Sequence, residues 1–282
     1  MSENDGSVAD MEIAFWGTRG TLPAPGQQFL KAGGNTNCTE VTCGNHTIVI
    51  DAGTGLRQLG SSVITQKATN SVHLMLTHAH YDHIEGIPFF APMFEDGRKL
   101  DIYCGELDGG RNTRETLQGL MRRPYFPVGP EVFCADLSYN DVKSGETFKI
   151  SDEIVVRTAG LNHPGGATAY RIDYRGKSFA CITDTEHIPG KPDEAVLQLI
   201  EGVDLFTYDC SLTDLELPEF EGYGHSTFEE AIRLCKMADA KAMRAFHHMP
   251  FRTDADLDDI ETYIRRELPD GAIAREGDRI IL

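Results

Sequence analysis

Three histidines and one aspartate lie within six consecutive positions, in the segment THAHYDHIEG at residues 77–86. These four donors are His78, His80, Asp82 and His83. They follow the apolar run VHLML and precede EGIPFF, so they lie at the carboxyl end of a strand, where α/β sheets usually carry their chemistry. Imidazoles and carboxylates packed this closely would repel one another or stay unsatisfied if they were buried without a cation. The segment therefore predicts a site for zinc, manganese or iron.

Short β-rich runs and helical patterns cover most of the remaining chain. Strands are expected at residues 11–17, 39–43, 46–51, 72–78, 99–104, 153–160, 167–174, 177–184, 203–209 and 278–282. Helices are expected at residues 54–64, 111–123, 191–202, 226–240 and 253–268, where apolar residues recur at spacings of three and four. Strands with hairpin-like spacing come first, and alternating strands and helices follow. This order predicts a layered α/β fold, as a single domain over residues 11–282 behind a loose acidic tail at residues 1–10.

The charge and cysteine content limit the partners of the chain. Its 44 acidic and 26 basic residues give a formal net charge of -18, and no basic stripe is available for wrapping nucleic acid. The first ten residues, MSENDGSVAD, lack the features of a signal peptide, and no apolar run reaches the roughly 18 residues of a membrane span. The seven cysteines are scattered without a CxxC pair, so a disulfide framework is not indicated. We expect a cytoplasmic protein with no membrane partner.

The HxHxDH pattern resembles the signature of the metallo-β-lactamase superfamily, whose αββα sandwich holds one or two metal ions. Members of that superfamily place a further histidine, a bridging aspartate and a last histidine at the ends of later strands. This chain has His163 after EIVVRTAG, Asp184 after KSFAC and His247 after KAMRAF, in that order. The resemblance spans nearly the whole chain and implies a four-layer αββα sandwich.

Carried over residue by residue, the resemblance implies two divalent cations, with zinc as the first expectation and manganese or iron as alternatives. The implied ligands of one cation are His78, His80 and His163. Those of the other are Asp82, His83 and His247, with Asp184 bridging the two cations. Two cations a few ångströms apart need an anionic bridge to offset their repulsion, and a shared hydroxide usually completes it.

Two further segments favour one branch of the superfamily. GHSTFEEAIRLCKMADAKAMRAFHH resembles the HST-containing segment of the tRNase Z and cyclic phosphodiesterase branch, and VDLFTYDCS lies where tRNase Z has a His-Glu-Ala-Thr motif. This correspondence puts Asp209 at the position of the glutamate and pairs it with His225. Cleavage of a phosphodiester needs a proton for the leaving oxygen, which a histidine oriented by a carboxylate supplies. We expect His225 and Asp209 to be catalytic, and we include the ligand Asp82 in the same catalytic set.

The departures from that branch point to a small substrate. Only twenty residues separate His163 from Asp184, which leaves no room for the extended arm with which tRNase Z grips tRNA. The net charge also weakens contact with a long polyanion. FWGTRGTLPAPG, GGNTNCTEV and IDAGTGLRQLG resemble a group that includes phosphoribosyl cyclic phosphodiesterases. We expect hydrolysis of a small phosphodiester, such as a cyclic nucleotide or a ribose cyclic phosphate, by a hydroxide bridging the two metals, and no long nucleic acid as partner.

Two alternatives use the same donors. True β-lactamases commonly have a cysteine at the position of Asp184, but lactonases and thioesterases keep the aspartate, so a metal-dependent lactone or thioester hydrolase is the first alternative. A di-iron protein that binds oxygen or acts as a sensor is the second, because His and Asp donors also suit iron. The segment from Gly105 to Val128 is compatible with a lid, with the surface of a homodimer, or with an ordinary surface helix and loop.

Several other residues are assigned supporting roles. Asp51 ends a strand and is expected to orient a metal-binding histidine. Arg19 is expected to form a surface salt bridge, with contact to the substrate as the alternative. Ser226 with Glu229 predicts a capping box that places His225 just ahead of a helix. Alignment of Pro250 with the H-x-S-P-R-Y segment of the superfamily selects His247 over His248 as the last ligand. Structural or exposed roles are expected for three histidines: His46, His73 and His187.

Overall fold

Two β-sheets form the centre of the fold in the computed structural model, which describes residues 11–66, 71–105, 107 and 110–282. The acidic tail expected at residues 1–10 lies outside these residues. The first sheet has the strand order β14-β1-β2-β3-β4-β5-β6. Its strands are β1 (Glu12–Gly17), β2 (Cys38–Cys43), β3 (His46–Ile50), β4 (Ser71–Leu76), β5 (Lys99–Gly105), β6 (Asp136–Val142) and β14 (Arg279–Ile281).

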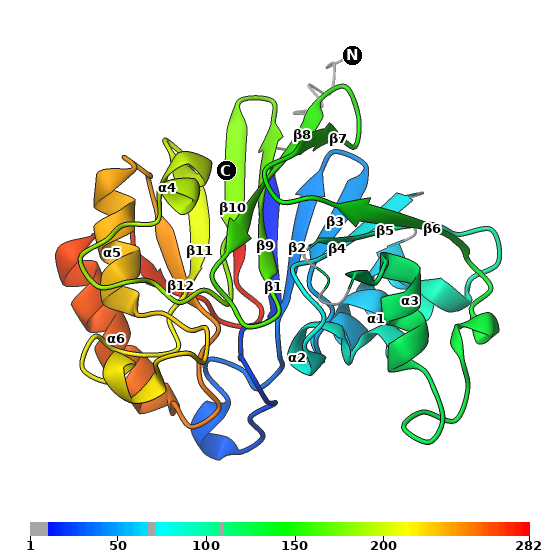
Figure 1. Cartoon of the computed structure of the whole chain (residues 1–282), viewed down its shortest axis with the longest axis horizontal. Coiled ribbons are helices and arrows are strands. Elements are labelled where there is room, and N and C mark those ends of the chain that lie inside the picture. Colours follow the sequence, from blue (N-terminus) through cyan, green and yellow to red (C-terminus); the bar gives the residue numbers. More distant parts are fainter. Residues whose placement is uncertain (1–10, 67–70, 106, 108–109) are drawn as a thin grey trace, which may run out of the picture.

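The second sheet has the order β13-β12-β11-β10-β9-β8-β7. Its strands are β7 (Thr147–Lys149), β8 (Ile154–Leu161), β9 (Ala167–Tyr174), β10 (Lys177–Cys181), β11 (Leu205–Asp209), β12 (Met243–Phe246) and β13 (Ala272–Ile273). The α-helices are α1 (Leu56–Gln66), α2 (Tyr81–Ile84), α3 (Thr113–Leu120), α4 (Glu194–Ile200), α5 (Phe228–Met237) and α6 (Asp254–Glu267). Figure 1 shows α4, α5 and α6 on the outer side of the second sheet, and α1 and α3 on the outer side of the first.

Three apolar cores separate the four layers. One lies between the sheets, and the other two lie between each sheet and its helices. The run VHLML in β4 explains how one strand serves two cores: Val72, Leu74 and Leu76 face the helices, whereas Met75 faces the second sheet. A strand buried on both faces reads as continuously apolar. The layers confirm the predicted αββα sandwich.

The direction of the strands determines where the loops meet. β3, β4, β5 and β6 run parallel in the first sheet, and β10, β11, β12 and β13 run parallel in the second. The carboxyl ends of parallel neighbours lie at one edge of a sheet. The segments that follow β4, β10, β11 and β12 carry most of the donors predicted from the sequence, and they are thereby brought to common edges.

The expected elements match the observed ones except at several ends and edges. The sequence ranges expected to be strands omitted β6, β7, β12 and β13, although the run KAMRAF, which contains β12, was read as the strand before His247. In β6, four of seven residues are polar or charged and most are partly exposed, so no apolar run marks the strand. The strands expected to end at residues 78 and 184 end at Leu76 and Cys181, which leaves the donors that follow them in loops.

The start of α5 also differs from the prediction. Its N-cap is Thr227, whose side chain accepts a hydrogen bond from the backbone N–H of Glu230. The capping box predicted from Ser226 and Glu229 is therefore wrong by one residue. The hydroxyl of Ser226 instead bonds to the hydroxyl of Tyr208 in the core, 3.1 Å away, so it is not available to the helix end. Among the described residues, no helix combines the length and apolarity needed to cross a membrane.

Candidate metal centre

The seven ligands predicted from the sequence lie close together, at the edges of the two sheets. Four lie in the segment after β4, and single residues follow β8, β10 and β12. Nitrogen and oxygen atoms of these side chains gather in groups whose members lie within 4.8 Å of one another. The two groups that match the predicted ligand sets are His78, His80 and His163, and Asp82, His83 and His247.

The first group, which we call the imidazole side, consists of His78, His80 and His163. Nδ1 of His80 lies 2.9 Å from Nε2 of His78 and 3.0 Å from Nε2 of His163. The other ring nitrogen of His163, Nδ1, bonds to the carbonyl oxygen of Gly224 at 2.9 Å, so it carries the proton and Nε2 presents its lone pair. Burial lowers the pKa of all three histidines, and that of His78 most strongly. Neutral imidazoles with converging lone pairs are what a metal ion binds.

The second group, the carboxylate side, consists of Asp82, His83 and His247, and Asp184 lies next to it. Oδ2 of Asp184 lies 3.1 Å from Nε2 of both histidines. Oδ2 of Asp82 lies 3.2 Å from Nε2 of His83 and 3.3 Å from Nε2 of His247. Nε2 of His247 is buried and has no hydrogen-bond partner of acceptable geometry, although two carboxylates are close. A buried polar atom aimed at carboxylates without bonding to them fits a cation between them.

The electrostatics of the carboxylate side also fit a cation. Burial opposes a proton on His247, yet Asp184 raises the pKa of this histidine to about 10. Burial opposes a proton on His83 as well, but Asp82 and Asp184 raise its pKa well above the ordinary value. Burial would raise the pKa of both aspartates, and the two histidines hold them below their usual range instead. The group therefore favours extra positive charge, which either protons or a divalent metal ion can supply.

Asp184 lies between the two sides. Its Oδ1 is 3.7 Å from Nε2 of His163, and its Oδ2 is 3.1 Å from Nε2 of His247. One carboxylate therefore lies near both groups, each through a different oxygen, as a ligand that bridges two cations can. The donor set fits two divalent cations.

A layer of hydrogen bonds orients these side chains. Oδ2 of Asp51 lies 2.8 Å from Nδ1 of His83, and its Oδ1 accepts from the backbone N–H of Thr77. Asp51 thus contacts a histidine of the centre, as the sequence predicts, and turns Nε2 of His83 toward the carboxylates. Ser211, which the sequence analysis did not single out, lies 3.0 Å from Nδ1 of His247 through its Oγ and donates to Asp209.

The loop after β1 also contacts the centre. The backbone N–H of Thr21 donates to Oδ2 of Asp82 at 2.7 Å. A Cβ at Gly20 would lie 2.0 Å from the His247 ring, so only glycine allows this close approach. Neither contact was predicted from the sequence, where FWGTRGTLPAPG was noted for its resemblance to a group of phosphodiesterases.

Asp209 and His225 form the pair expected from the sequence. Oδ2 of Asp209 lies 2.9 Å from Nδ1 of His225, and the His225 ring centroid is 5.0 Å from that of His247. Burial would lower the pKa of His225, but Asp209 more than offsets this effect and raises it. Burial would raise the pKa of Asp209, which His225 lowers instead. Because Asp209 holds Nδ1, the opposite ring nitrogen of His225 is left for another partner.

His248 lies apart from the carboxylates. Its Nε2 bonds to the carbonyl oxygen of Ala274 at 2.9 Å, and burial lowers its pKa to about 3. The geometry therefore favours His247 as the last ligand. The backbone of His247 is left-handed, with φ 60°, as it is for Asp184 at 48° and Asp51 at 62°. Left-handed backbone in non-glycine residues gathers at functional sites.

The supporting prediction for Arg19 is also wrong. Arg19 is fully buried and forms no surface salt bridge: its guanidinium donates to the carbonyl oxygens of Gly33, Met249 and Arg252. It ties the loop after β1, which carries Gly33, to the segment after β12, where the carbonyl groups of Met249 and Arg252 accept from it. The histidines outside the centre have structural contacts. Nδ1 of His187 bonds to Oγ of Ser226, and Nδ1 of His46 lies 3.3 Å from Nε2 of His73.

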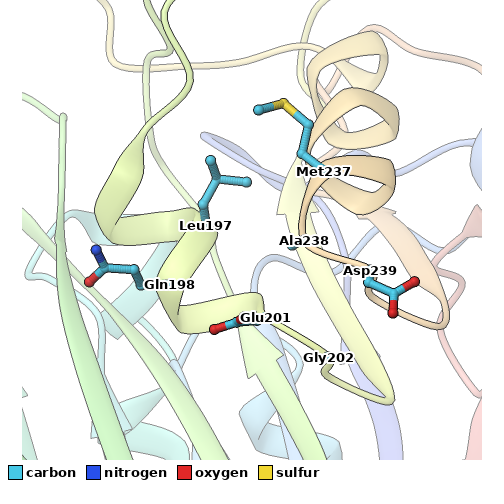
Figure 2. A pocket seen from close by; sticks show the side chains of 7 residues that line it. All are labelled: Leu197, Gln198, Glu201, Gly202, Met237, Ala238 and Asp239. Carbon is cyan, nitrogen blue, oxygen red and sulfur yellow. The ribbon is translucent and has the colours of Figure 1, made fainter.

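A separate surface hollow of about 470 Å³ lies between the ends of α4 and α5 (Figure 2). It is lined by Leu197, Gln198, Glu201, Gly202, Met237, Ala238 and Asp239. The lining includes none of the predicted ligands and no histidine. The hollow therefore offers no chemistry comparable to that of the metal centre.

Comparisons with known proteins agree with this geometry. Residues 46–248 match the family model described as beta-lactamase superfamily domain. Ribonuclease Z of Haloarcula marismortui is 23% identical over an alignment of 297 residues that covers 89% of each chain. The metallo-β-lactamase fold protein YhfI from Bacillus subtilis superposes with a TM-score of 0.71 at 19% identity and covers 96% of this chain and 99% of its own. A diphosphatase from the PhnP family gives a TM-score of 0.68 at 15% identity, over 96% and 98% of the two chains. The chain therefore belongs to the β-lactamase superfamily and has the metallo-β-lactamase fold.

Proposed function

We propose that the protein is a metal-dependent hydrolase of a small phosphodiester, of the cyclic nucleotide or ribose cyclic phosphate type. The observation that carries this proposal is the Asp209–His225 pair, which lies beside the ligand groups with a ring separation of 5.0 Å between His225 and His247. A thioester expels a thiolate, which needs less help from a proton donor than an alkoxide leaving phosphorus does, so an oriented histidine favours phosphodiester over thioester cleavage. A lactone also expels an alkoxide, and the substrate panel below separates it from a phosphodiester.

The imidazole side and the carboxylate side would hold the two cations, with Asp184 between them. Zinc is the first candidate, and manganese and iron are the alternatives, because imidazole and carboxylate donors suit all three. When bound, the cations supply Lewis-acid charge at the phosphoryl oxygens and lower the pKa of a water molecule.

The chain's own residues supply the proton. Asp209 accepts from Nδ1 of His225 and favours its protonated form, so the other ring nitrogen carries a proton that can pass to the leaving oxygen. Asp82 belongs to the same set: it accepts from the backbone N–H of Thr21 and keeps negative charge beside His247. Because these groups are buried, water does not compete for their hydrogen bonds.

The size of the substrate is argued from charge and chain length. The net charge of -18 and the twenty residues between His163 and Asp184 favour a small substrate over a long polyanion. The curated relatives named Ribonuclease Z make RNA the competing candidate, and a precursor tRNA therefore belongs in the test. A cytoplasmic location and a homodimer stay predictions from the sequence.

A substrate panel with metal reconstitution tests the proposal. Protein loaded with zinc, manganese or iron is assayed with bis-p-nitrophenyl phosphate, cyclic nucleotides, ribose cyclic phosphates, a precursor tRNA, lactones and glutathione thioesters. We expect turnover of the small phosphodiesters. Turnover of carboxylic substrates alone would support the lactone or thioester hydrolase, and turnover of the precursor alone would support an RNA-processing enzyme. An oxygen-sensitive iron-oxo band without any hydrolysis would support the di-iron protein.

The proton donor is tested by His225→Ala. We expect turnover of a cyclic nucleotide to fall by about 10²- to 10⁴-fold, the usual contribution of a positioned acid, while elemental analysis finds unchanged metal content. His46→Ala is the matched control, because it removes an imidazole that bonds only to His73 in the first sheet. Equal turnover in the two variants would contradict the role of His225.

A further inference from the structure

We propose that Glu186 is a positioning residue that holds the loop at residues 222–225 against the metal centre, and thereby sets both His163 and His225. This inference rests on the proposed function, because it assigns the presentation of the proton donor to a residue outside the ligand sets. Glu186 belongs to none of the candidate metal groups found among the described residues. It therefore acts through other residues.

The carboxylate of Glu186 accepts hydrogen bonds from two backbone groups of one loop. Its Oε2 accepts from the N–H of Gly222 at 2.8 Å and from that of Gly224 at 2.9 Å, and its Oε1 lies 3.0 Å from the same N–H of Gly222. Both glycines have left-handed backbone, with φ 86° and 84°. Glycine-rich backbone has wide conformational freedom, so this loop needs an external restraint to keep one conformation.

The backbone of Glu186 is itself fixed to the segment that follows β8 and carries His163. Its N–H donates to the carbonyl oxygen of Asn162 at 2.8 Å, and the side chain of Asn162 donates to its carbonyl oxygen at 2.7 Å. Glu186 lies two residues after Asp184. It therefore joins three segments, namely those that follow β8 and β10 and the one that precedes α5.

The loop at residues 222–225 contacts His163 and contains His225. The carbonyl oxygen of Gly224 accepts from Nδ1 of His163, which fixes the tautomer that aims Nε2 at the imidazole side. A Cβ at Gly224 would lie 2.1 Å from the same Nδ1, so the contact is as close as glycine permits. The next residue is His225, whose ring lies 5.7 Å from that of His163. A single carboxylate thus determines the place of a predicted ligand and of the proton donor.

Glu186→Ala is the principal test. Freeing the loop displaces His225, and a displacement of about 1 Å can reduce turnover on the order of 10²-fold. The loss should fall on kcat and not on KM. It should be large for a cyclic nucleotide, whose leaving alkoxide needs a proton, and small for bis-p-nitrophenyl phosphate, whose leaving phenolate does not. A general loss of structure would reduce both activities equally.

Two variants serve as controls. Glu186→Gln keeps one oxygen that can accept from both glycine N–H groups, and we expect it to retain most of the activity. Glu221→Ala removes an exposed carboxylate from the neighbouring position of the same loop, and we expect the properties of the unmodified protein. Thermal unfolding and elemental analysis of each variant identify any that is misfolded or depleted of metal.

Hydrogen–deuterium exchange gives a readout that does not depend on activity. The backbone amides of residues 222–225 should exchange faster in Glu186→Ala than in Glu221→Ala or Glu186→Gln. Equal exchange in all three variants would overturn the inference, and so would an equal loss of activity on both leaving groups with the metal content unchanged. If His225→Ala had full activity, the proposed proton donor would fail, while the exchange rates would still decide whether Glu186 holds the loop.

Discussion

The two sides of the metal centre differ in charge although they share one bridging carboxylate. Burial keeps the imidazole side neutral, whereas the carboxylates raise the pKa values of the histidines on the other side. The imidazole side offers the lone pairs of uncharged nitrogens, which a cation can accept. The carboxylate side requires positive charge whether a metal is bound or not. Histidines that lie within a few ångströms of one another therefore have opposite electrostatic roles. Those of the imidazole side stay neutral, whereas those of the carboxylate side favour positive charge.

The largest effect is expected where the two sides meet. Asp184→Ala removes the one carboxylate that reaches both groups, and we expect turnover to fall by about 10³-fold, as for loss of a central electrostatic group. Elemental analysis should find fewer than two metal ions per chain. Asp152→Ala, which removes an exposed aspartate from a distant loop, is the control. Two retained ions in Asp184→Ala would contradict the bridge.

A smaller and one-sided effect is expected from Asp51→Asn. The neutral amide is a weaker acceptor than the carboxylate for Nδ1 of His83, which lies 2.8 Å from Oδ2 of Asp51. Loss of such an orienting group typically weakens metal affinity about 10- to 100-fold. Titration with a chromophoric chelator should show one weakened site and one unchanged site. Equal weakening of both sites would break the distinction between the two sides.

When the metal is removed, the charge difference between the two sides should make the stability of the folded chain depend on pH. The pKa of His247 is about 10 in the folded chain against an ordinary value of 6.5. A raised pKa stabilises the folded state fully below pH 6.5 and loses this contribution as the pH rises through about 10. The midpoint of thermal unfolding of the chelated protein should fall across this window. The lowered pKa of His78 acts in the other direction and only below its ordinary value of 6.5. A flat profile above pH 6.5 would contradict the charge assigned to the carboxylate side.

The smallest effect is expected from a change that touches neither side. Thr253 caps α6 and accepts from the backbone N–H of Asp256, and Thr253→Ala should lower the free energy of unfolding by about 1 kcal/mol. Metal content and turnover should stay as in the unmodified protein, as measured by elemental analysis and by the phosphodiester assay. A loss of metal in this variant would mean that the centre depends on global stability instead of its own contacts.

Much of the centre could be predicted because its donors are side chains that a sequence pattern can identify. The cluster at residues 78–83 is contiguous, and His163, Asp184 and His247 each follow a recognisable strand. Ser211 and Glu186 were missed because they act on atoms distant in sequence: a histidine ring 36 residues away and two backbone N–H groups at least 36 residues away. Serine and glutamate are common in surface loops, so their type gives no signal.

The errors have tertiary causes. Arg19 was expected at the surface because most arginines are exposed, and the sequence does not reveal that carbonyl groups 14 and more than 200 residues away need its donors. Ser226 was taken as a helix cap because serine is a good cap, but its hydroxyl is engaged by Tyr208 in the core. In both cases, hydrogen bonds between segments distant in sequence outweigh the usual preference of the residue type for the surface or for a helix cap.

The left-handed backbone at Asp51, Asp184 and His247 limits how this centre can be redesigned. Asparagine, aspartate and histidine tolerate that conformation better than other side chains, and β-branched residues tolerate it least. A library that varies these three positions would lose valine, isoleucine and threonine to backbone strain before any property of the active site was tested. Replacement by asparagine separates the effect of the donor from that of the main chain, so it is the substitution with which engineering of this protein should begin.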